Sequence, residues 1–319
     1  MLEIPSAAFP REQAPDGSFR RQQSIFRDWV RADPASPFPA ASGRYHLYVS
    51  LACPWAHRTI IYRRIKGLED AVSMTIVDPE RDERGWAIMD GPDNTPDPVN
   101  GLAFLSEAYQ ASAPGFSGRV TVPVLWDTVT GRIVNNESAE IIRMFDREFG
   151  AVAAFDAPVL YPPELEGEID HINATVYAHV NNGVYRCGFA VTQRAYEAAF
   201  QDLFGALDAL ESRLSQRRYL IGDQITEADW RLFTTLVRFD PVYVGHFKCN
   251  LRRIVDYPNL WGYLCDLFQQ PFISETVNFS HIKRHYYRTH VTINPTRIVP
   301  VGPHMNLSEP HGREAMAHG

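Results

Sequence analysis

Apolar and polar residues follow two different periods along the chain, and the change divides it near residue 150. Before that point, short apolar runs rich in β-branched and aromatic residues predict strands at 44–50, 71–77 and 121–127. Apolar residues at helical spacing predict a helix over 55–66, and residues 132–149 indicate a strand, an Asn-Asn turn and a helix. This order of elements predicts a compact α/β unit built on a small sheet.

From residue 164 onward the pattern becomes helical. Apolar positions predict helices over 164–181, 192–216, 226–236 and 258–268, the first ending at an Asn-Asn-Gly stop. Thr226 to Asp229 matches a capping box, in which two side chains satisfy each other's backbone N–H groups, so we expect a structural role for Asp229. The predicted fold class is therefore α/β + all-α.

Proline- and glycine-rich stretches set the domain bounds of this 319-residue chain, which is long enough for two domains. We predict an N-terminal extension at 1–43, an α/β domain at 44–150, a linker at 151–163, a helical domain at 164–290, and a C-terminal extension and tail at 291–319. The α/β domain contains a long polar insertion at 78–119. Loops of such length are usually functional or disordered.

Composition narrows the class of protein. The chain is 45% hydrophobic and 22% charged, which is typical of a soluble globular protein. Its formal net charge of −7 and the lack of a basic block indicate no nucleic-acid partner, and no apolar run approaches bilayer length. Four widely and irregularly spaced cysteines, without a secretory signal, predict a cytoplasmic protein. His281 and His285 are four residues apart, but no further ligand completes a metal site locally, so we expect no metal.

The stretch LACPWAHR holds the strongest chemical signal, because Cys53 stands between a predicted strand and a predicted helix. Pro54 suits the first helical position, and the unpaired N–H groups and dipole at a helix start favour a thiolate. His57 and Arg58 add positive potential there. A buried inert cysteine is the alternative, but this setting favours a nucleophile. Because Ala56 stands where a C-x-x-C motif has its second thiol, the resolving thiol must come from elsewhere, and a soluble thiol such as glutathione is the natural candidate.

LACPWAHR resembles the active-site motif of glutathionyl-hydroquinone reductases, the xi class of the glutathione transferase superfamily, and similar stretches extend from about residue 20 to about residue 303. The resemblance implies a thioredoxin-like N-terminal domain, an all-helical glutathione transferase C-terminal domain, and a homodimer. It also implies glutathione contacts from five residues, namely Trp86, Arg119, Val122, Glu137 and Ser138.

Two parts of this implied set have a physical rationale. A cis bond before Pro123 would expose the Val122 backbone to strand-like pairing with glutathione. Glu137 and Ser138 at a helix start would bind the γ-glutamyl end. Simpler alternatives stay open, since Trp86 could be a loop anchor and the Glu-Ser pair a plain helix cap.

Three tyrosine-bearing stretches stand out: NNGVYRCGFA with Tyr185, DPVYVGHFKCN with Tyr243, and HIKRHYYRTHVTINP with Tyr286 and Tyr287. Taken singly, each could be an ordinary, partly buried tyrosine. The resemblance implies that they line an aromatic-substrate site together with His290. Cys187, two residues after Tyr185, is either a second thiol at that site or a packing residue.

The implied activity is reduction of a glutathionyl-hydroquinone. Cys53 would attack the glutathione sulfur, Tyr185, Tyr286 or Tyr287 would supply a proton to the ring, and a second glutathione would release glutathione disulfide. Glutathione is thus a co-substrate, and no tightly bound cofactor is expected. The alternatives are an omega-like thioltransferase or dehydroascorbate reductase, a conventional glutathione-conjugating transferase, and a binding module without activity. The physiological hydroquinone and the proton donor stay open.

Overall fold

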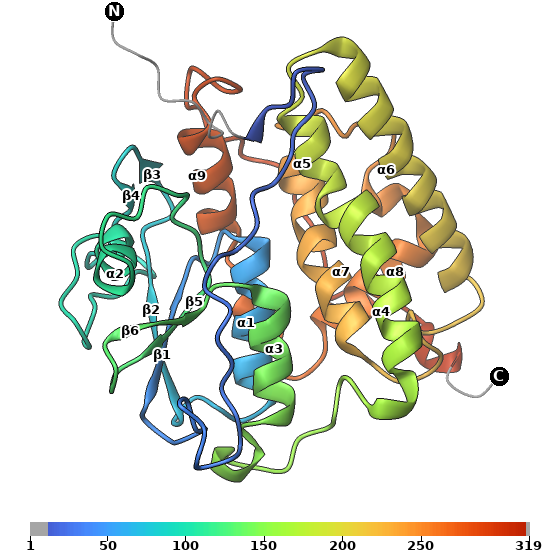
Figure 1. The fold of residues 1–319 in the computed structure, drawn as a ribbon. Coiled ribbons are helices and arrows are strands. Elements are labelled where there is room, and N and C mark those ends of the chain that lie inside the picture. Colours follow the sequence, from blue (N-terminus) through green and yellow to red (C-terminus); the bar gives the residue numbers. More distant parts are fainter. Residues whose placement is uncertain (1–11, 317–319) are drawn as a thin grey trace, which may run out of the picture. The chain divides into compact units, whose positions relative to one another are not determined.

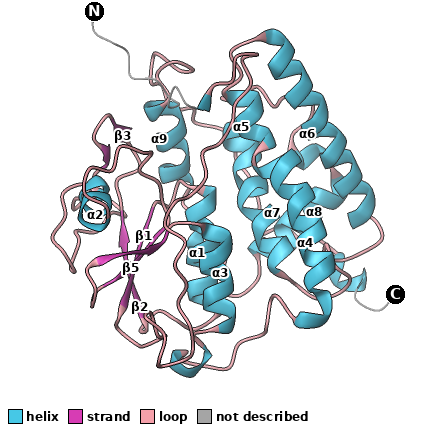
Figure 2. Cartoon of the chain, in the orientation of Figure 1, coloured by secondary structure: helices cyan, strands magenta, loops and turns pink. Residues whose placement is uncertain are grey.

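The computed structural model describes residues 12–316, which divide into two compact units (Figure 1). The first unit consists of Gln23–Val159 and Thr276–Val291. Within the described residues, the second contains residues 12–22, Leu160–Glu275 and residues 292–316. Figure 2 shows that the strands belong to the first unit, whereas the described part of the second consists of helices and loops. The predicted α/β plus all-α class is confirmed.

A four-stranded sheet forms the centre of the first unit. Its strands are β1 (Tyr45–Val49), β2 (Val72–Ile76), β5 (Val124–Asp127) and β6 (Arg132–Asn135), in the order β2-β1-β5-β6. β1 pairs with β2 in parallel and with β5 antiparallel, and β6 pairs antiparallel with β5. All five residues of β1 are buried, as expected of a central strand. The third predicted strand starts later than expected, at Val124, because Pro123 lacks the N–H that a ladder needs.

Helices cover this sheet on both sides. α1 (Pro54–Ile65) and α3 (Ser138–Arg147) pack against each other, and α2 (Leu105–Ser112) packs against β6 (Figure 1). The expectation of a loop throughout 78–119 was wrong, because this insertion contains α2 and a hairpin of β3 (Arg81–Asp82) and β4 (Gly85–Trp86). α2 is only two turns long, and its buried residues, Leu105, Ala108 and Tyr109, give too short a pattern to stand out between prolines and glycines.

Two segments that the sequence placed outside the α/β domain belong to the first unit. α9 (Phe279–Thr289) belongs to the first unit, where His285 Nδ1 lies 2.7 Å from the carbonyl O of Pro79 and Asn278 Nδ2 donates to Asp93 at 2.8 Å. The N-terminal extension also contributes, because Asp28 N donates to Val134 O at 3.0 Å along the free edge of β6. Contacts between segments far apart in the sequence leave no periodic pattern from which they could be predicted.

The second unit is a helical bundle. Its helices are α4 (Glu166–Thr175), α5 (Gly183–Gly188), α6 (Gln193–Leu214), α7 (Glu227–Arg238) and α8 (Pro258–Phe268). π-helical turns at Val176–Asn181 and Phe239–Tyr243 follow α4 and α7. The predicted stop at Asn-Asn-Gly was wrong, because Asn182 keeps helical angles (φ −86°, ψ −23°) and α5 follows at once. Asn181 donates to Arg231 O at 3.0 Å and Thr235 Oγ1 at 2.7 Å instead of ending the helix.

The predicted capping box at the start of α7 is confirmed. The Thr226 side chain accepts from the backbone of the third helical residue, and the Asp229 carboxylate accepts from Thr226 N at 2.8 Å. Asp229 is completely buried and also accepts from Leu220 N at 2.9 Å and from Tyr263 Oη at 2.8 Å. The box therefore connects α7 to α8 and to the loop before it.

None of the helices within residues 12–316 is long and apolar enough to span a membrane.

A buried histidine in β1 predicts acid sensitivity. Both ring nitrogens of His46 contact hydroxyl groups, Ser73 Oγ at 2.7 Å and Thr75 Oγ1 at 2.9 Å, and burial lowers its pKa to about 4 from 6.5. In the unfolded chain this histidine binds a proton near pH 6.5, whereas in the folded protein it does so only near pH 4. Neutral His46 therefore contributes to the unfolding free energy above pH 6.5, and this contribution is lost as the pH falls to 4.

We expect His46 to account for about 2–3 kcal/mol of lost unfolding free energy between pH 7 and pH 4.5. Urea unfolding of the wild type and of His46→Asn at both pH values measures this. Between pH 7 and pH 4.5, the unfolding free energy of His46→Asn should fall by about 2–3 kcal/mol less than that of the wild type. This difference does not depend on how stable the variant is at pH 7. Equal losses in both proteins would show that His46 does not titrate as the structure indicates.

Candidate active site

Cys53 is the N-cap residue of α1. Its backbone is extended (φ −79°, ψ 123°), Pro54 occupies the first helical position, and Cys53 O accepts from His57 N at 2.9 Å. The half-buried thiol donates to the carbonyl O of Val122 at 3.6 Å. The thiol therefore stands at the positive end of a helix dipole, as the sequence predicted, and directly beside a second predicted site residue.

The first turn of α1 is fixed by two buried polar side chains. His57 is fully buried, and its Nε2 lies 2.8 Å from Thr276 Oγ1. Arg58 is 1% exposed, with its guanidinium 4.6 Å from the centre of the Trp55 ring. Its Nη1 donates to Ser138 Oγ at 3.4 Å, which connects the helix of Cys53 to the start of α3. The sequence indicated only a general positive potential at Arg58 and gave no sign of this contact.

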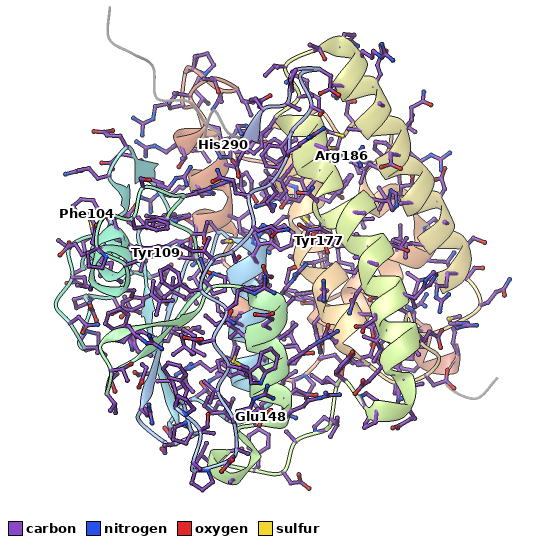
Figure 3. The ribbon with its side chains drawn as sticks, in the orientation of Figure 1. Phe104, Tyr109, Glu148, Tyr177, Arg186 and His290 are labelled. Carbon is purple, nitrogen blue, oxygen red and sulfur yellow. The ribbon has the colours of Figure 1, made fainter. Side chains whose placement is uncertain are left out.

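Val122 stands at the end of the loop before β5. The Val122–Pro123 peptide bond is cis, as the resemblance implied. In the part of the chain that the structure describes, Val122 N–H donates no hydrogen bond, although the side chain is buried. The preceding residue is held at both ends, because Thr121 N donates to Tyr109 Oη at 3.1 Å and Tyr109 Oη donates to Thr121 O at 2.9 Å. Tyr109 is labelled in Figure 3.

Glu137 and Ser138 begin α3. Glu137 is the N-cap residue and accepts from Ala139 N at 3.2 Å, so the simple capping interpretation describes one of its oxygens. Its other oxygen accepts from Ser24 Oγ at 3.0 Å. Ser138 is 2% exposed. Ser24 was missed, because the N-terminal extension has no periodicity that would have indicated where it runs.

Trp86 and Arg119 come from the insertion. Trp86 is 4% exposed and stacks on His285 of α9, with ring centroids 5.0 Å apart and planes at 22°. Its Nε1–H has no hydrogen-bond partner among the described residues. Arg119 is half-buried and acts on Tyr109, the pKa of which is raised by burial and lowered by this cation. Trp86 thus serves as an anchor for the hairpin, and its contact with glutathione stays a prediction.

The predicted tyrosines fall into two groups. In the first unit, Tyr286 is 1% exposed, and its ring lies 5.6 Å from that of His290, which closes α9 (Figure 3). Tyr287 beside it is half-buried, and burial raises its pKa. In the second unit, the rings of Tyr185 and Tyr243 are 6.2 Å apart. Tyr243 is completely buried, so its direct contact with a substrate stays a prediction that burial does not favour.

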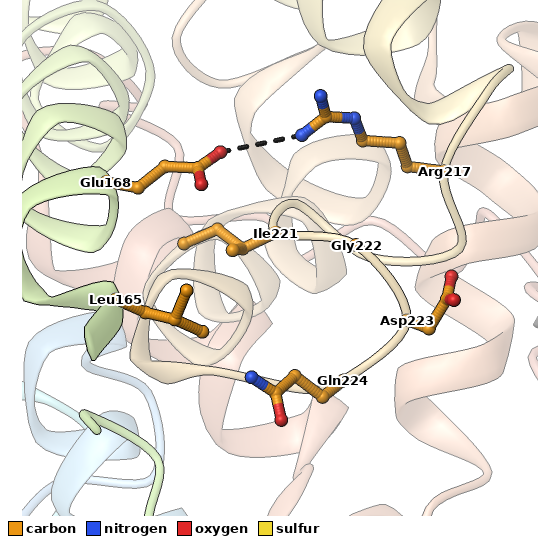
Figure 4. Close-up of a pocket in the computed structure, with 7 residues that line it drawn as sticks. All are labelled: Leu165, Glu168, Arg217, Ile221, Gly222, Asp223 and Gln224. Carbon is orange, nitrogen blue, oxygen red and sulfur yellow. Dashed lines mark hydrogen bonds and ion pairs between the residues drawn. The ribbon is translucent and has the colours of Figure 1, made fainter. Parts of the chain in front are cut away.

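A surface hollow of about 470 Å³ in the second unit involves none of these residues (Figure 4). It is lined by Leu165, Glu168, Arg217, Ile221, Gly222, Asp223 and Gln224. Glu168 pairs there with Arg217 at 3.5 Å and with Arg213 at 2.8 Å. Because these charges satisfy one another, we assign no ligand to the hollow. Among residues 12–316, no three side chains of His, Cys, Asp or Glu converge to hold a metal ion.

Comparison with known proteins agrees with this arrangement. The family models for the N-terminal and C-terminal domains of glutathione S-transferase match residues 52–148 and 193–264. The chain is 54% identical to the glutathionyl-hydroquinone reductase YqjG of Escherichia coli, over 93% of both chains. It is 52% identical to the glutathionyl-hydroquinone reductase PcpF of Sphingobium chlorophenolicum, over 90% of both.

Solved structures agree with the sequence matches. A glutathione-bound structure of the E. coli protein superposes with a TM-score of 0.88, covering 91% of this chain and 96% of that one. The Xi class transferase of Natrialba magadii is 49% identical with a TM-score of 0.90, over 95% and 96% of the two chains. The chain therefore belongs to the glutathione transferase family. Within it, the chain falls among the Xi class, as its active-site motif indicated.

Proposed function

We propose that this protein is a glutathionyl-hydroquinone reductase with Cys53 as its nucleophile. The observation that carries the proposal is the half-buried Cys53 thiol at the start of α1, 3.6 Å from Val122 O. A conventional conjugating transferase would need a serine or tyrosine hydroxyl at this point to stabilise the glutathione thiolate. A thiol at the positive end of a helix favours disulfide chemistry instead.

Glutathione binds, in this proposal, along the segment before β5 and the start of α3. Val122 N–H has no partner among the described residues, and it pairs with the glutathione backbone as an added strand would. The Ser138 hydroxyl and the N–H groups of the first turn of α3 bind the γ-glutamyl carboxylate, and Glu137 balances its ammonium group. Arg58, which already contacts Ser138, holds that hydroxyl in place. Trp86 and Arg119 flank the site from the insertion.

The proposed reaction has two steps. The Cys53 thiolate attacks the sulfur of the glutathionyl-hydroquinone, a sulfur–sulfur bond forms, and the carbon–sulfur bond breaks. The ring carbon leaves with that electron pair and takes up one proton, so the hydroquinone is released while the two sulfurs are oxidised to a mixed disulfide. A glutathione thiolate then attacks the mixed disulfide, which releases glutathione disulfide and restores the Cys53 thiolate.

The proton comes from a tyrosine of the aromatic-substrate site, with Tyr185, Tyr286 and Tyr287 as candidates. Burial raises the pKa of Tyr287, which keeps its hydroxyl protonated at neutral pH but makes it a weaker acid, so this shift does not single it out among the three candidates. His290 belongs to the proposed aromatic site as well, and Tyr243 is a predicted member that its complete burial does not favour. We further propose that the protein acts as a homodimer in the cytoplasm, where glutathione keeps thiols reduced.

Single-turnover mass spectrometry tests this function. Enzyme and a glutathionyl-hydroquinone are mixed in equal amounts without free glutathione, beside the variant Cys53→Ser. We expect one hydroquinone released per wild-type chain and one glutathione mass added to the protein, with neither in the variant. Intact substrate and unmodified wild-type protein would contradict the proposal. Turnover of dehydroascorbate, but not of the hydroquinone conjugate, would indicate an omega-like reductase.

Removing the Ser138 hydroxyl is expected to weaken glutathione binding. Loss of a hydrogen bond to a charged group corresponds to about 1.5–3 kcal/mol, so Ser138→Ala should raise the KM for glutathione about tenfold or more with little change in kcat. Initial rates at varied glutathione concentration measure this. Ser212→Ala, an exposed serine in α6, is the matched control and should leave the KM unchanged. An unaltered KM in Ser138→Ala would exclude the proposed contact.

A further inference from the structure

Cys187 and Cys249 form a pair of buried thiols in the second unit. Cys187 lies in α5 and is 3% exposed, and Cys249 follows the π-helical turn after α7 and is 0% exposed. Both are free cysteines. The Cys249 thiol donates to Phe247 O at 3.8 Å, and the neighbouring Cys187 thiol raises its pKa. Two thiols far apart in the sequence are therefore neighbours in the core of the second unit.

The segments that hold these thiols run in close contact. A Cβ on Gly188 would lie 2.1 Å from the Phe247 ring, so only glycine permits this approach. One residue further on, the rings of Phe189 and Phe247 are 5.2 Å apart. Thus residues 187–189 lie beside residues 247–249.

The segment before Cys249 has a fixed shape. Lys248 adopts a left-handed backbone conformation with φ 60°, which few non-glycine residues do. Its carbonyl O accepts from Tyr196 Oη of α6 at 2.8 Å, and Cys249 N donates to Tyr243 O at 2.9 Å. These contacts fix the backbone on both sides of the Cys249 side chain.

We propose that Cys187 and Cys249 form a second thiol site, which a small peroxide converts into an intramolecular disulfide. The site is separate from the Cys53 thiol, and the oxidation does not depend on the proposed function. A disulfide needs the two Cβ atoms about 3.5–4.5 Å apart, and the close approach of Gly188 and Phe189 to Phe247 brings the two cysteine-bearing segments within reach of this spacing.

The oxidation balances with hydrogen peroxide as the oxidant. Burial raises the pKa of the Cys249 thiol, and its interaction with Cys187 raises it further, so Cys249 keeps its proton. In the proposed order, the Cys187 sulfur attacks the peroxide oxygen, which gives a Cys187 sulfenic acid and one water. The Cys249 sulfur then displaces the hydroxyl group, the sulfur–sulfur bond forms, and the second water leaves with the Cys249 proton.

The burial of the pair selects the oxidant. Hydrogen peroxide is close to water in size and can reach a buried thiol during small openings of the fold. Glutathione disulfide must bring one of its sulfurs in line with an attacking thiolate, which sulfur atoms exposed by only 3% and 0% do not allow. We therefore expect peroxide, and not glutathione disulfide, to close the bond.

A closed bond would fix an aromatic cluster. It would connect α5 to the segment after Tyr243, and the rings of Tyr185, Phe189, Tyr243 and Phe247 lie between these two parts with neighbouring centroids 5.2–6.2 Å apart. A cross-link over such a long loop removes entropy from the unfolded chain. The oxidised protein should therefore unfold at a temperature about 5 °C higher than the reduced protein.

Peptide mapping of the full chain tests the proposal in a Cys53→Ser background, which removes the half-buried thiol that would compete for peroxide. The reduced protein is treated with hydrogen peroxide or glutathione disulfide, unfolded in an alkylating reagent, and digested without reduction. With peroxide we expect two thiols to be lost and the peptides of Cys187 and Cys249 to be linked. Glutathione disulfide should leave both alkylated.

Three variants in the same background complete the test. Cys187→Ser and Cys249→Ser should each abolish the linked peptides and the rise in unfolding temperature. Cys265→Ser is the control, because this thiol in α8 is also buried and burial raises its pKa to about 12; it should keep both signals. Alkylation of both cysteines after peroxide, oxidation of either one without linkage, or a bond to another cysteine would overturn the proposal. If a serine variant at Cys187 or Cys249 fails to fold, the peptide map of Cys53→Ser, which keeps both cysteines, still shows whether they are linked.

Discussion

Replacing Cys53 with serine should lower the rate of glutathionyl-hydroquinone reduction by at least about 10³–10⁴-fold. A serine hydroxyl stays protonated at neutral pH, and an oxygen nucleophile cannot form the mixed disulfide from which glutathione disulfide is released. The steady-state rate, measured with saturating glutathione by the appearance of the free hydroquinone, checks this prediction. Active enzyme in Cys53→Ser would place the nucleophile elsewhere.

The fold should survive this change, which makes the result specific to chemistry. Cys53 is the N-cap residue of α1, and serine is favoured at that position. A serine hydroxyl can also donate to Val122 O, as the thiol does at 3.6 Å. We therefore expect the unfolding temperature of Cys53→Ser to match that of the wild type within a few degrees.

Cys265→Ser is the matched control for the rate, because it removes a thiol that lies in the core of α8 and outside the proposed site. The folded fraction of this variant should keep the wild-type rate. A similar loss in both variants would indicate a general effect of removing thiols and not a role for Cys53.

Local sequence signals predicted the elements that place Cys53. The strand at Tyr45–Val49, the helix at Pro54–Ile65 and the strand-turn-helix around Glu137 were recognisable because each has its own apolar period and its own boundary residue. Pro54 directly after the predicted strand indicated a helix start, and so did the Thr226–Asp229 capping box. These signals act within a few residues and do not depend on the remainder of the fold.

Contacts between distant segments were not predictable in this way. Nothing in the sequence places Ser24 against Glu137, Arg58 against Ser138, or α9 beside the Trp86 hairpin. The two tyrosine groups show the same limit. Tyr286 and His290 share a helix and are brought together by its period, whereas the approach of Tyr185 to Tyr243 depends on how α5 packs against the end of α7.

Replacing Asp229 with alanine should have the largest effect on stability, about 4–6 kcal/mol of unfolding free energy. The carboxylate is completely buried and accepts from Thr226 N, Leu220 N and Tyr263 Oη. Burial raises its pKa, and these hydrogen bonds lower it. Burial, with the nearby Asp229 carboxylate, also raises the pKa of Tyr263, so that hydroxyl keeps the proton that it donates.

The expected loss of unfolding free energy follows from the three hydrogen-bond donors that Asp229→Ala would leave buried without an acceptor. Each buried donor without a partner costs about 1–3 kcal/mol, and a lost helix cap costs about 0.5–2 kcal/mol. Native proteins are stable by only about 5–15 kcal/mol, so Asp229→Ala is expected to be close to unfolded at 37 °C. Asp229→Asn keeps an acceptor oxygen and should lose about half as much.

Urea unfolding followed by circular dichroism measures the loss, with Asp223→Ala as the matched control. Asp223 is an exposed aspartate in the loop before the same helix, and its removal should change the unfolding free energy by less than about 0.5 kcal/mol. A loss below about 1 kcal/mol in Asp229→Ala would show that water replaces the carboxylate at these donors. Any folded fraction of Asp229→Ala should still accept one glutathione on Cys53, because the capping box lies in the second unit and the thiol in the first.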